Sequence, residues 1–76
     1  EFAHAILLTE SAYAIGHTIH ALALASREVC IIALNREGQE IEEPDANTIL
    51  RAQDTLVLRG KPLKIEHIER YLQEGP

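Results

Sequence analysis

The sequence contains no tryptophan and no methionine, and its only aromatic residues are two tyrosines and one phenylalanine. A hydrophobic core must therefore be built mainly from isoleucine, leucine, valine and alanine. Because 46% of the residues are hydrophobic, the composition is typical of a globular domain and not of a disordered chain. With 76 residues, only about 60% of the unfolded surface can be buried, so we expect one small domain that gains stability from a partner subunit.

A single cysteine, Cys30, excludes an internal disulfide and fits a reducing compartment. It lies in the apolar run of residues 29–34, where a thiol usually behaves as a small hydrophobic side chain, so we expect it to be buried. No apolar run approaches the roughly 18 residues that span a bilayer, and no signal peptide is visible. We therefore expect a soluble domain, and the start at Glu1 suggests a piece of a longer protein.

Basic residues are also few, since seven Lys and Arg stand against twelve Asp and Glu, for a formal net charge of −5. Such a chain offers no positive field for a phosphate backbone, and we predict that nucleic acid is not a partner. Ser11 and Ser26 lie in no nucleophile motif, and Cys30 has no neighbouring base. We therefore predict no catalytic residues and no enzymatic activity.

Hydrophobic periodicity predicts the order strand, helix, strand, strand, strand, helix, which is typical of an α+β domain with a small mixed or antiparallel sheet. The strands are expected at residues 2–8, 29–35, 39–43 and 55–59. A helix of about two turns is expected around Ile15, Ile19 and Leu22, and a longer one after Pro62 with Ile65, Ile68 and Leu72 buried. The second strand is apolar on both faces of its pleat, which predicts a central strand covered on both sides.

Three segments stand in a distinctive order. They are Gly16-His17-Thr18-Ile19 followed by Leu22 and Leu24; residues 31–36 followed by Gly38; and Pro44 leading through Thr48 to Asp54, Leu56 and Gly60. Together they resemble the TrkA-C domain, also called the C-terminal domain of regulators of potassium conductance (RCK-C), over nearly the whole chain. Where that pattern has Gly-Asp before the last strand, this sequence has Gln53-Asp54, so the turn must form without the glycine.

The resemblance implies that residues 1–76 form one cytoplasmic regulatory domain of a potassium channel, a potassium-uptake system or a cation/proton antiporter. In the parent protein, the domain would be attached to a transporter in the inner or plasma membrane. Such domains pair as homodimers and need no cofactor, and some bind cyclic di-AMP or another nucleotide between the subunits. The positions that correspond to the ligand-lined strand and turn of the family are Ile31, Ile32, Asn35, Arg36 and Ile41.

Two other interpretations of these residues remain open. The isoleucines are core residues by default, and Arg36 can pair across the hairpin with Glu40 or Glu42 instead of with a ligand. The alternative function is then a purely structural dimerisation module without a ligand.

A third, less favoured alternative is a metal-sensing domain that uses His17 and His20, which lie three residues apart near one side of the short helix. A tetrahedral zinc site needs three or four ligands, and the sequence places no third one nearby. We therefore predict no metal site, and expect both histidines to face solvent beside a buried Ile19. The acidic run of Glu37, Glu40, Glu42, Glu43 and Asp45 lacks the spacing of a calcium loop, and we interpret it as the exposed face of an edge strand.

Overall fold

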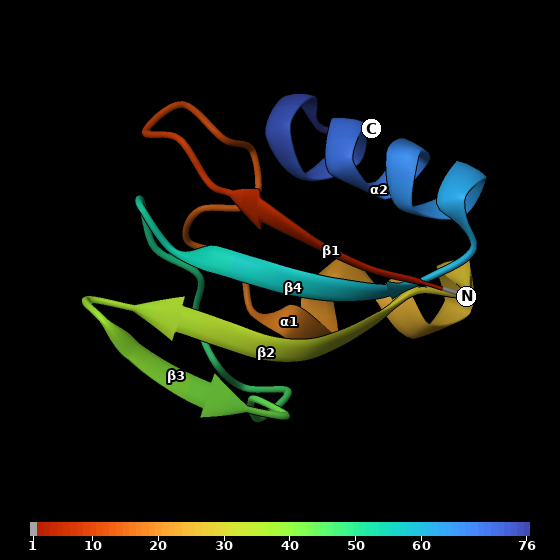
Figure 1. Cartoon of the computed structure of the whole chain (residues 1–76). Coiled ribbons are helices and arrows are strands. Elements are labelled where there is room, and N and C mark those ends of the chain that lie inside the picture. Colours follow the sequence, from red (N-terminus) through yellow and green to blue (C-terminus); the bar gives the residue numbers. More distant parts are fainter. Residues whose placement is uncertain (1) are drawn as a thin grey trace.

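Four strands form one antiparallel sheet in the computed structural model, which describes residues 2–76 (Figure 1). The strands are β1 (Phe2–Leu7), β2 (Cys30–Arg36), β3 (Gln39–Glu42) and β4 (Thr55–Gly60). Their order across the sheet is β1-β4-β2-β3, so the last strand of the chain lies between the first two. The predicted α+β class is confirmed.

The helical elements are α1 (Ile19–Leu22), the 3₁₀ turn η1 (Leu24–Arg27) and α2 (Pro62–Glu74). Thr18 caps α1 by accepting a hydrogen bond from the Ala21 N–H. The helix is shorter than the predicted two turns because Ala23 adopts a left-handed conformation with φ of 52° and ends it. In α2, Pro62 opens the first turn, and Ile65, Ile68 and Leu72 are buried as predicted.

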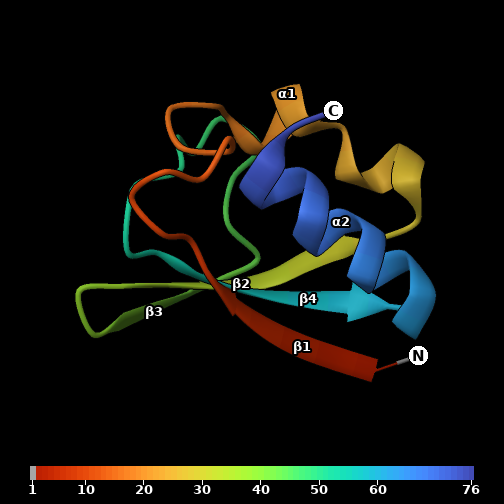
Figure 2. The same cartoon turned by 90° about the horizontal axis from the view of Figure 1, so that it is seen from above.

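Figure 2 shows that all three helical elements lie on one side of the sheet. The core between them is aliphatic, with Leu22, Leu34, Leu50 and Leu56 among the fully buried side chains. The opposite face of the sheet, which we call the open face, carries no helix of residues 2–76. The prediction that β2 is covered on both sides was therefore wrong, as was the prediction that Cys30 is buried, since Cys30 is exposed.

A β-bulge in β2 explains both errors. Ile31 pairs with Leu58 and Ala33 pairs with Val57, so Ile32 is one extra residue between them. Side chains alternate along a regular strand, and an extra residue reverses that alternation. As a result, Ile31 and Leu34 both face the helices, although they are three residues apart. The sequence of β2 therefore looks apolar at both alternating sets of positions, although only one face of the strand is covered.

The β2–β3 hairpin forms as predicted, with Glu37 and Gly38 at φ of 51° and 81° in the turn. Glu40 and Glu42 are exposed on the edge strand β3, as predicted. After the hairpin, residues 43–54 run without regular structure apart from an isolated bridge between Ile49 and Thr18. Two side chains of this connection, Leu50 and Asp54, are buried.

The chain passes from β4 to α2 through the single residue Lys61, and this corner is tightly packed. A Cβ atom on Gly60 would lie 3.1 Å from the Glu28 carbonyl oxygen and 3.3 Å from Val29 Cγ2. Gly60 is therefore required because the backbone before β2 approaches it closely. None of the helices in residues 2–76 has the length and apolar character needed to cross a membrane.

Candidate functional site

An apolar pocket of about 480 Å³ opens between the α1–η1 segment, β2 and the chain that follows β3. It is lined by Ile19, His20, Ala23, Leu24, Ala25, Ser26, Val29, Cys30, Ile31, Pro44 and Ala46. None of these side chains is a carboxylate, a lysine or an arginine. The polar groups within reach are the imidazole of His20, the hydroxyl of Ser26 and the thiol of Cys30, so the pocket suits a mostly apolar or aromatic group.

Local sequence explains why this space is empty of side chains. Left-handed Ala23 turns the chain between α1 and η1, and the alanines at positions 23, 25 and 46 have no side chain beyond Cβ to fill the gap. On the opposite wall, Pro44 follows Glu43, whose φ of 46° turns the chain away from β3. Two stretches of the chain, residues 19–31 and residues 44–46, thus form the pocket.

A second hollow, of about 620 Å³, lies across β2 and reaches the open face of the sheet. Its lining includes Glu40, Glu42 and Glu43 together with Arg59, and Ile31 and Ile32 also contribute. Three carboxylates against one guanidinium repel an anion. This acidic hollow is therefore poorly suited to an anionic ligand.

The structure distributes the five sequence-predicted ligand positions over several places. Ile31 lines both hollows, whereas Ile32 lines only the acidic one. Asn35 is exposed and pairs with Thr55 on the open face, and Ile41 is 40% exposed but lines neither hollow. Arg36 points to the helix side of the sheet and away from both.

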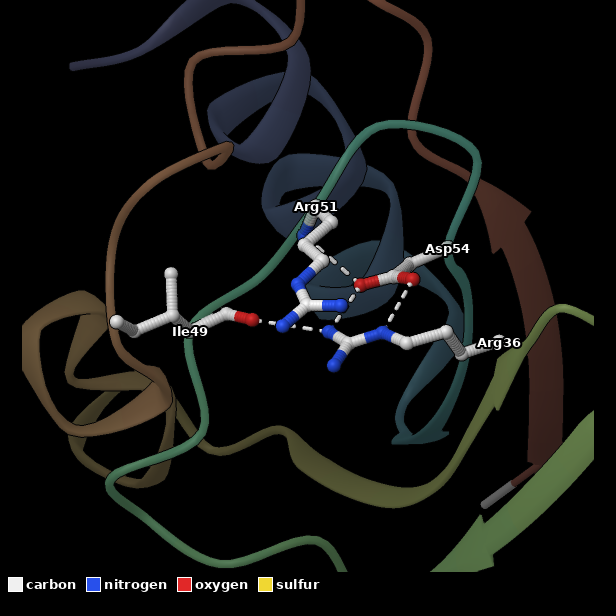
Figure 3. Close-up of polar contacts among 4 residues, drawn as sticks. All are labelled: Arg36, Ile49, Arg51 and Asp54. Carbon is white, nitrogen blue, oxygen red and sulfur yellow. Dashed lines mark hydrogen bonds and ion pairs between the residues drawn. The ribbon is translucent and has the colours of Figure 1, made fainter.

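The guanidinium of Arg36 holds Asp54 in a bidentate ion pair (Figure 3). Arg36 Nε donates to Asp54 Oδ1 at 2.9 Å and Nη2 donates to Oδ2 at 2.7 Å, while Nη2 also donates to the Ile49 carbonyl at 2.9 Å. The alternative pairing of Arg36 with Glu40 or Glu42 does not form, for a geometric reason. Arg36 pairs with Gln39 in the hairpin, so both glutamates project from the other face of the sheet.

Asp54 is 1% exposed and accepts a third hydrogen bond from the Arg51 N–H at 2.8 Å. Burial alone would raise the pKa of its carboxyl, but the hydrogen bonds from Arg36 and Arg51 and the charges of both arginines outweigh burial and lower that pKa. The hydrogen bond to Asp54 in turn raises the pKa of Arg36, against the effect of burial. Sequence reasoning missed Asp54 as the partner of Arg36; the available signals were its position directly before β4 and its match to the aspartate of the Gly-Asp pattern.

The histidine pair is divided between two environments. His20 is exposed at the pocket rim, whereas His17 is half-buried with its ring 4.6 Å from that of Tyr13. The Nδ1 atom of His17 is buried and has no hydrogen-bond partner among residues 2–76. The expectation of two solvent-facing histidines beside a buried Ile19 was thus wrong for His17, and Ile19 is only half-buried. In the described part of the chain, no three His, Cys, Asp or Glu side chains are placed to hold a metal ion.

Comparison with solved structures finds the same fold in other RCK_C domains. The RCK_C domain dimer of S. agalactiae BusR in complex with c-di-AMP superposes with a TM-score of 0.82 at 20% identity, covering 92% of this chain and 93% of that one. The RCK C domain of the potassium transport protein KtrA, also in complex with c-di-AMP, gives 0.81 at 25% identity and covers 90% and 79% of the two chains. None of the curated protein sequences matches significantly.

One of the matched structures corrects the prediction about nucleic acid. S. agalactiae BusR in complex with its busAB-promotor DNA matches with a TM-score of 0.82 at 20% identity. The matched region covers 92% of this chain but only 35% of the BusR chain. A protein that contains this fold can therefore have DNA as a partner, and excluding nucleic acid was wrong. The charge argument failed because it considered 76 residues alone, whereas most of the BusR chain lies outside the matched region.

The sequence itself settles the family. The model of the TrkA-C domain matches residues 3–73, which is nearly the whole chain, and the fold agrees with the RCK_C domains of BusR and KtrA. The resemblance that was drawn from Gly16, Arg36, Gly38, Asp54 and Gly60 is thereby confirmed. The chain belongs to the TrkA-C (RCK-C) domain family.

Proposed function

We propose that this chain is a ligand-sensing regulatory domain of a potassium channel, a potassium-uptake system or a cation/proton antiporter. It acts as a homodimer on the cytoplasmic side of the membrane and binds cyclic di-AMP, or another nucleotide, at the interface of its two subunits. The observation that carries the proposal is the apolar pocket, which has no carboxylate in its lining although the chain has a net charge of −5. The KtrA and BusR domains in complex with c-di-AMP support the choice of ligand.

The chemistry of the pocket matches one half of such a ligand. An adenine ring offers two apolar faces, which Ile31 and Pro44 can contact, and polar edges, which His20 and Ser26 can meet at the rim. Cyclic di-AMP is two-fold symmetric, so two copies of the chain related by a two-fold axis can each receive one adenine. Ile31 is our proposed contact; ligand roles for Ile32, Asn35 and Ile41 stay predictions.

Binding between two subunits also provides a way to regulate a transporter. A ligand that binds one arrangement of the dimer better than another shifts the equilibrium between the two arrangements. The shift is limited by the difference in affinity, which is typically about 1–3 kcal/mol in allosteric proteins. No catalytic step is needed for this function.

Filling the pocket tests the proposal. Ala46→Leu places a larger side chain on the pocket wall, and we expect it to weaken cyclic di-AMP binding by about tenfold or more in isothermal titration calorimetry. Ala3→Leu, at an exposed position of β1 outside the pocket, is the matched control and should bind as the wild type does. A dimer by light scattering that binds neither cyclic di-AMP nor other nucleotides would favour the structural dimerisation module.

A further inference from the structure

The pocket has one wall that belongs to no helix or strand. Pro44 and Ala46 form it, and both lie in the irregular chain of residues 44–54, which we call the wall segment. Its first half is attached to α1, because the Ala46 carbonyl accepts a hydrogen bond from the His20 N–H at 2.9 Å and the Thr48 carbonyl accepts one from the Ile19 N–H at 3.1 Å. The position of this wall therefore depends on where the wall segment is anchored.

The backbone of the second half of the wall segment is hydrogen-bonded to Leu8, Gly16 and His17, and the side chain of Arg36 adds an anchor from β2. One nitrogen, Nη2, reaches both the Ile49 carbonyl and the Asp54 carboxylate, and Nε bonds the other carboxylate oxygen (Figure 3). The same carboxylate accepts the Arg51 N–H. We call this arrangement of Arg36, the Ile49 carbonyl and Asp54 the clamp. It links the β2–β3 hairpin to both ends of the stretch from residue 49 to 54.

The clamp leaves Arg36 poorly placed to hold a ligand. Arg36 does not line the apolar pocket, its side chain is 18% exposed, and Nε and Nη2 are both engaged. Swinging it toward a phosphate would leave the Asp54 carboxylate buried without its partner, and a buried charge that loses its partner is costly. Direct ligand contact through Nε or Nη2 of Arg36 would thus break its hydrogen bonds to the buried Asp54 carboxylate.

We infer that Arg36 is a positioning residue of the ligand site, which fixes the Pro44 and Ala46 wall through Asp54 and does not touch the ligand. The inference rests on the proposed function, because it assumes that cyclic di-AMP occupies the apolar pocket. It assigns Arg36 a role that differs from the ligand contact implied by its position in the sequence.

Asp54→Asn separates the two roles. If Arg36 bound a phosphate, releasing it from Asp54 would leave the affinity for cyclic di-AMP unchanged or increase it. If Arg36 positions the wall, the same change weakens binding by about five- to tenfold. Arg36→Lys, which keeps the charge but loses the planar fork, should weaken binding similarly, and the double variant should be no worse than either single one. Glu40→Gln removes one carboxylate from the same hairpin outside the clamp and is the matched control.

The titrations are run at a temperature where circular dichroism shows every variant to be folded, so that loss of affinity is not loss of fold. The salt dependence of binding gives an independent readout. A residue that neutralises a phosphate contributes to that dependence. Arg36→Met removes the charge and should nevertheless keep the wild-type slope, because Arg36 does not touch the ligand. A reduced slope in Arg36→Met would overturn the inference.

A ligand-free measurement keeps the inference testable if the ligand is wrong. In ¹⁵N–¹H spectra, Asp54→Asn should shift the amide signals of Ala46 and His20, on the pocket side of the wall segment, and Glu40→Gln should not. Unmoved signals at these two residues would overturn the positioning role. Failure of the wild type to bind cyclic di-AMP would instead overturn the proposed function, so the two failures are distinguishable.

Discussion

Replacing Asp54 by asparagine tests how much the clamp contributes to the stability of the domain. Asparagine is nearly isosteric, but it removes the charge and turns one of the two acceptor oxygens into a donor. At least one of the three hydrogen bonds that Asp54 accepts is then lost, and Arg36 loses its counter-ion. Hydrogen bonds to charged groups contribute about 1.5–3 kcal/mol each.

The loss in stability follows from the burial of the pair. Removing one partner of a buried ion pair costs about 3–5 kcal/mol. Asp54 is almost fully buried, but the 18% exposure of the Arg36 side chain lets water solvate part of the guanidinium, so we expect about 2–4 kcal/mol for Asp54→Asn. For a domain of this size, that change lowers Tm by about 8–32 °C.

The direction in which the stability difference between wild type and Asp54→Asn changes with pH is a separate test. Because the pKa of Asp54 is lower in the folded state than in the unfolded chain, its contribution is fully present above the unfolded pKa and is lost as pH falls through the folded pKa. The difference between wild type and Asp54→Asn should therefore be constant between about pH 7 and 5 and shrink below about pH 4. Asparagine does not titrate, so the change comes from the wild type.

Urea unfolding followed by far-ultraviolet circular dichroism is the suitable assay, because the chain has no tryptophan. Glu40→Gln serves as the control and should change the unfolding free energy by less than about 0.5 kcal/mol, as is usual for exposed positions. The reasoning is refuted if Asp54→Asn costs no more than this control at pH 7. It is equally refuted if the difference between wild type and Asp54→Asn grows as the solution is acidified.

Two further predictions concern single backbone and surface positions. Gln53 occupies the glycine position of the family pattern with φ of +73°, so Gln53→Gly should relieve strain and stabilise the domain by about 0.5–1 kcal/mol in the same urea assay, after allowing for the greater freedom of glycine in the unfolded chain. Ala52→Gly, next to it without a positive φ, should destabilise, and an equal loss for both variants would contradict this account. Cys30→Ser should change stability by less than about 0.5 kcal/mol, and the native thiol should react with Ellman's reagent without unfolding. A loss above about 1.5 kcal/mol, or a thiol that reacts only in urea, would mean that Cys30 is packed in the core.

The features that local sequence encodes were the predictable ones. Pro62 at its start and apolar residues at helical spacing predict the α2 helix. Gly38 between two strand patterns predicts the hairpin. The order of elements and the family followed from these signals, because each depends on residues close together in the chain. Which side chains of β2 face the helices could not be predicted, because a one-residue bulge reverses side-chain alternation and composition gives no sign of it.

The candidate site depends on contacts between distant residues and was only partly predictable. Ile31 was identified and lines the pocket, but the opposite wall comes from Pro44 and Ala46, which carry no chemical signal. Arg36 was identified as a candidate ligand contact or as a partner of Glu40 or Glu42. Its actual partner lies 18 residues away, and only the fold decides between Asp54 and the nearer glutamates.

The close contact at Gly60 bears on where the domain can accept foreign sequence. Because β4, Lys61 and the start of α2 form one corner against the Glu28 carbonyl, an added residue there has no room and would rotate α2 off its buried stripe. The hairpin tip at Gly38, by contrast, has open space around it. A fluorophore or a short reporter inserted between Glu37 and Gly38 would extend from the molecule without disturbing the core. The same insertion at the Gly60 corner would disrupt the packing there.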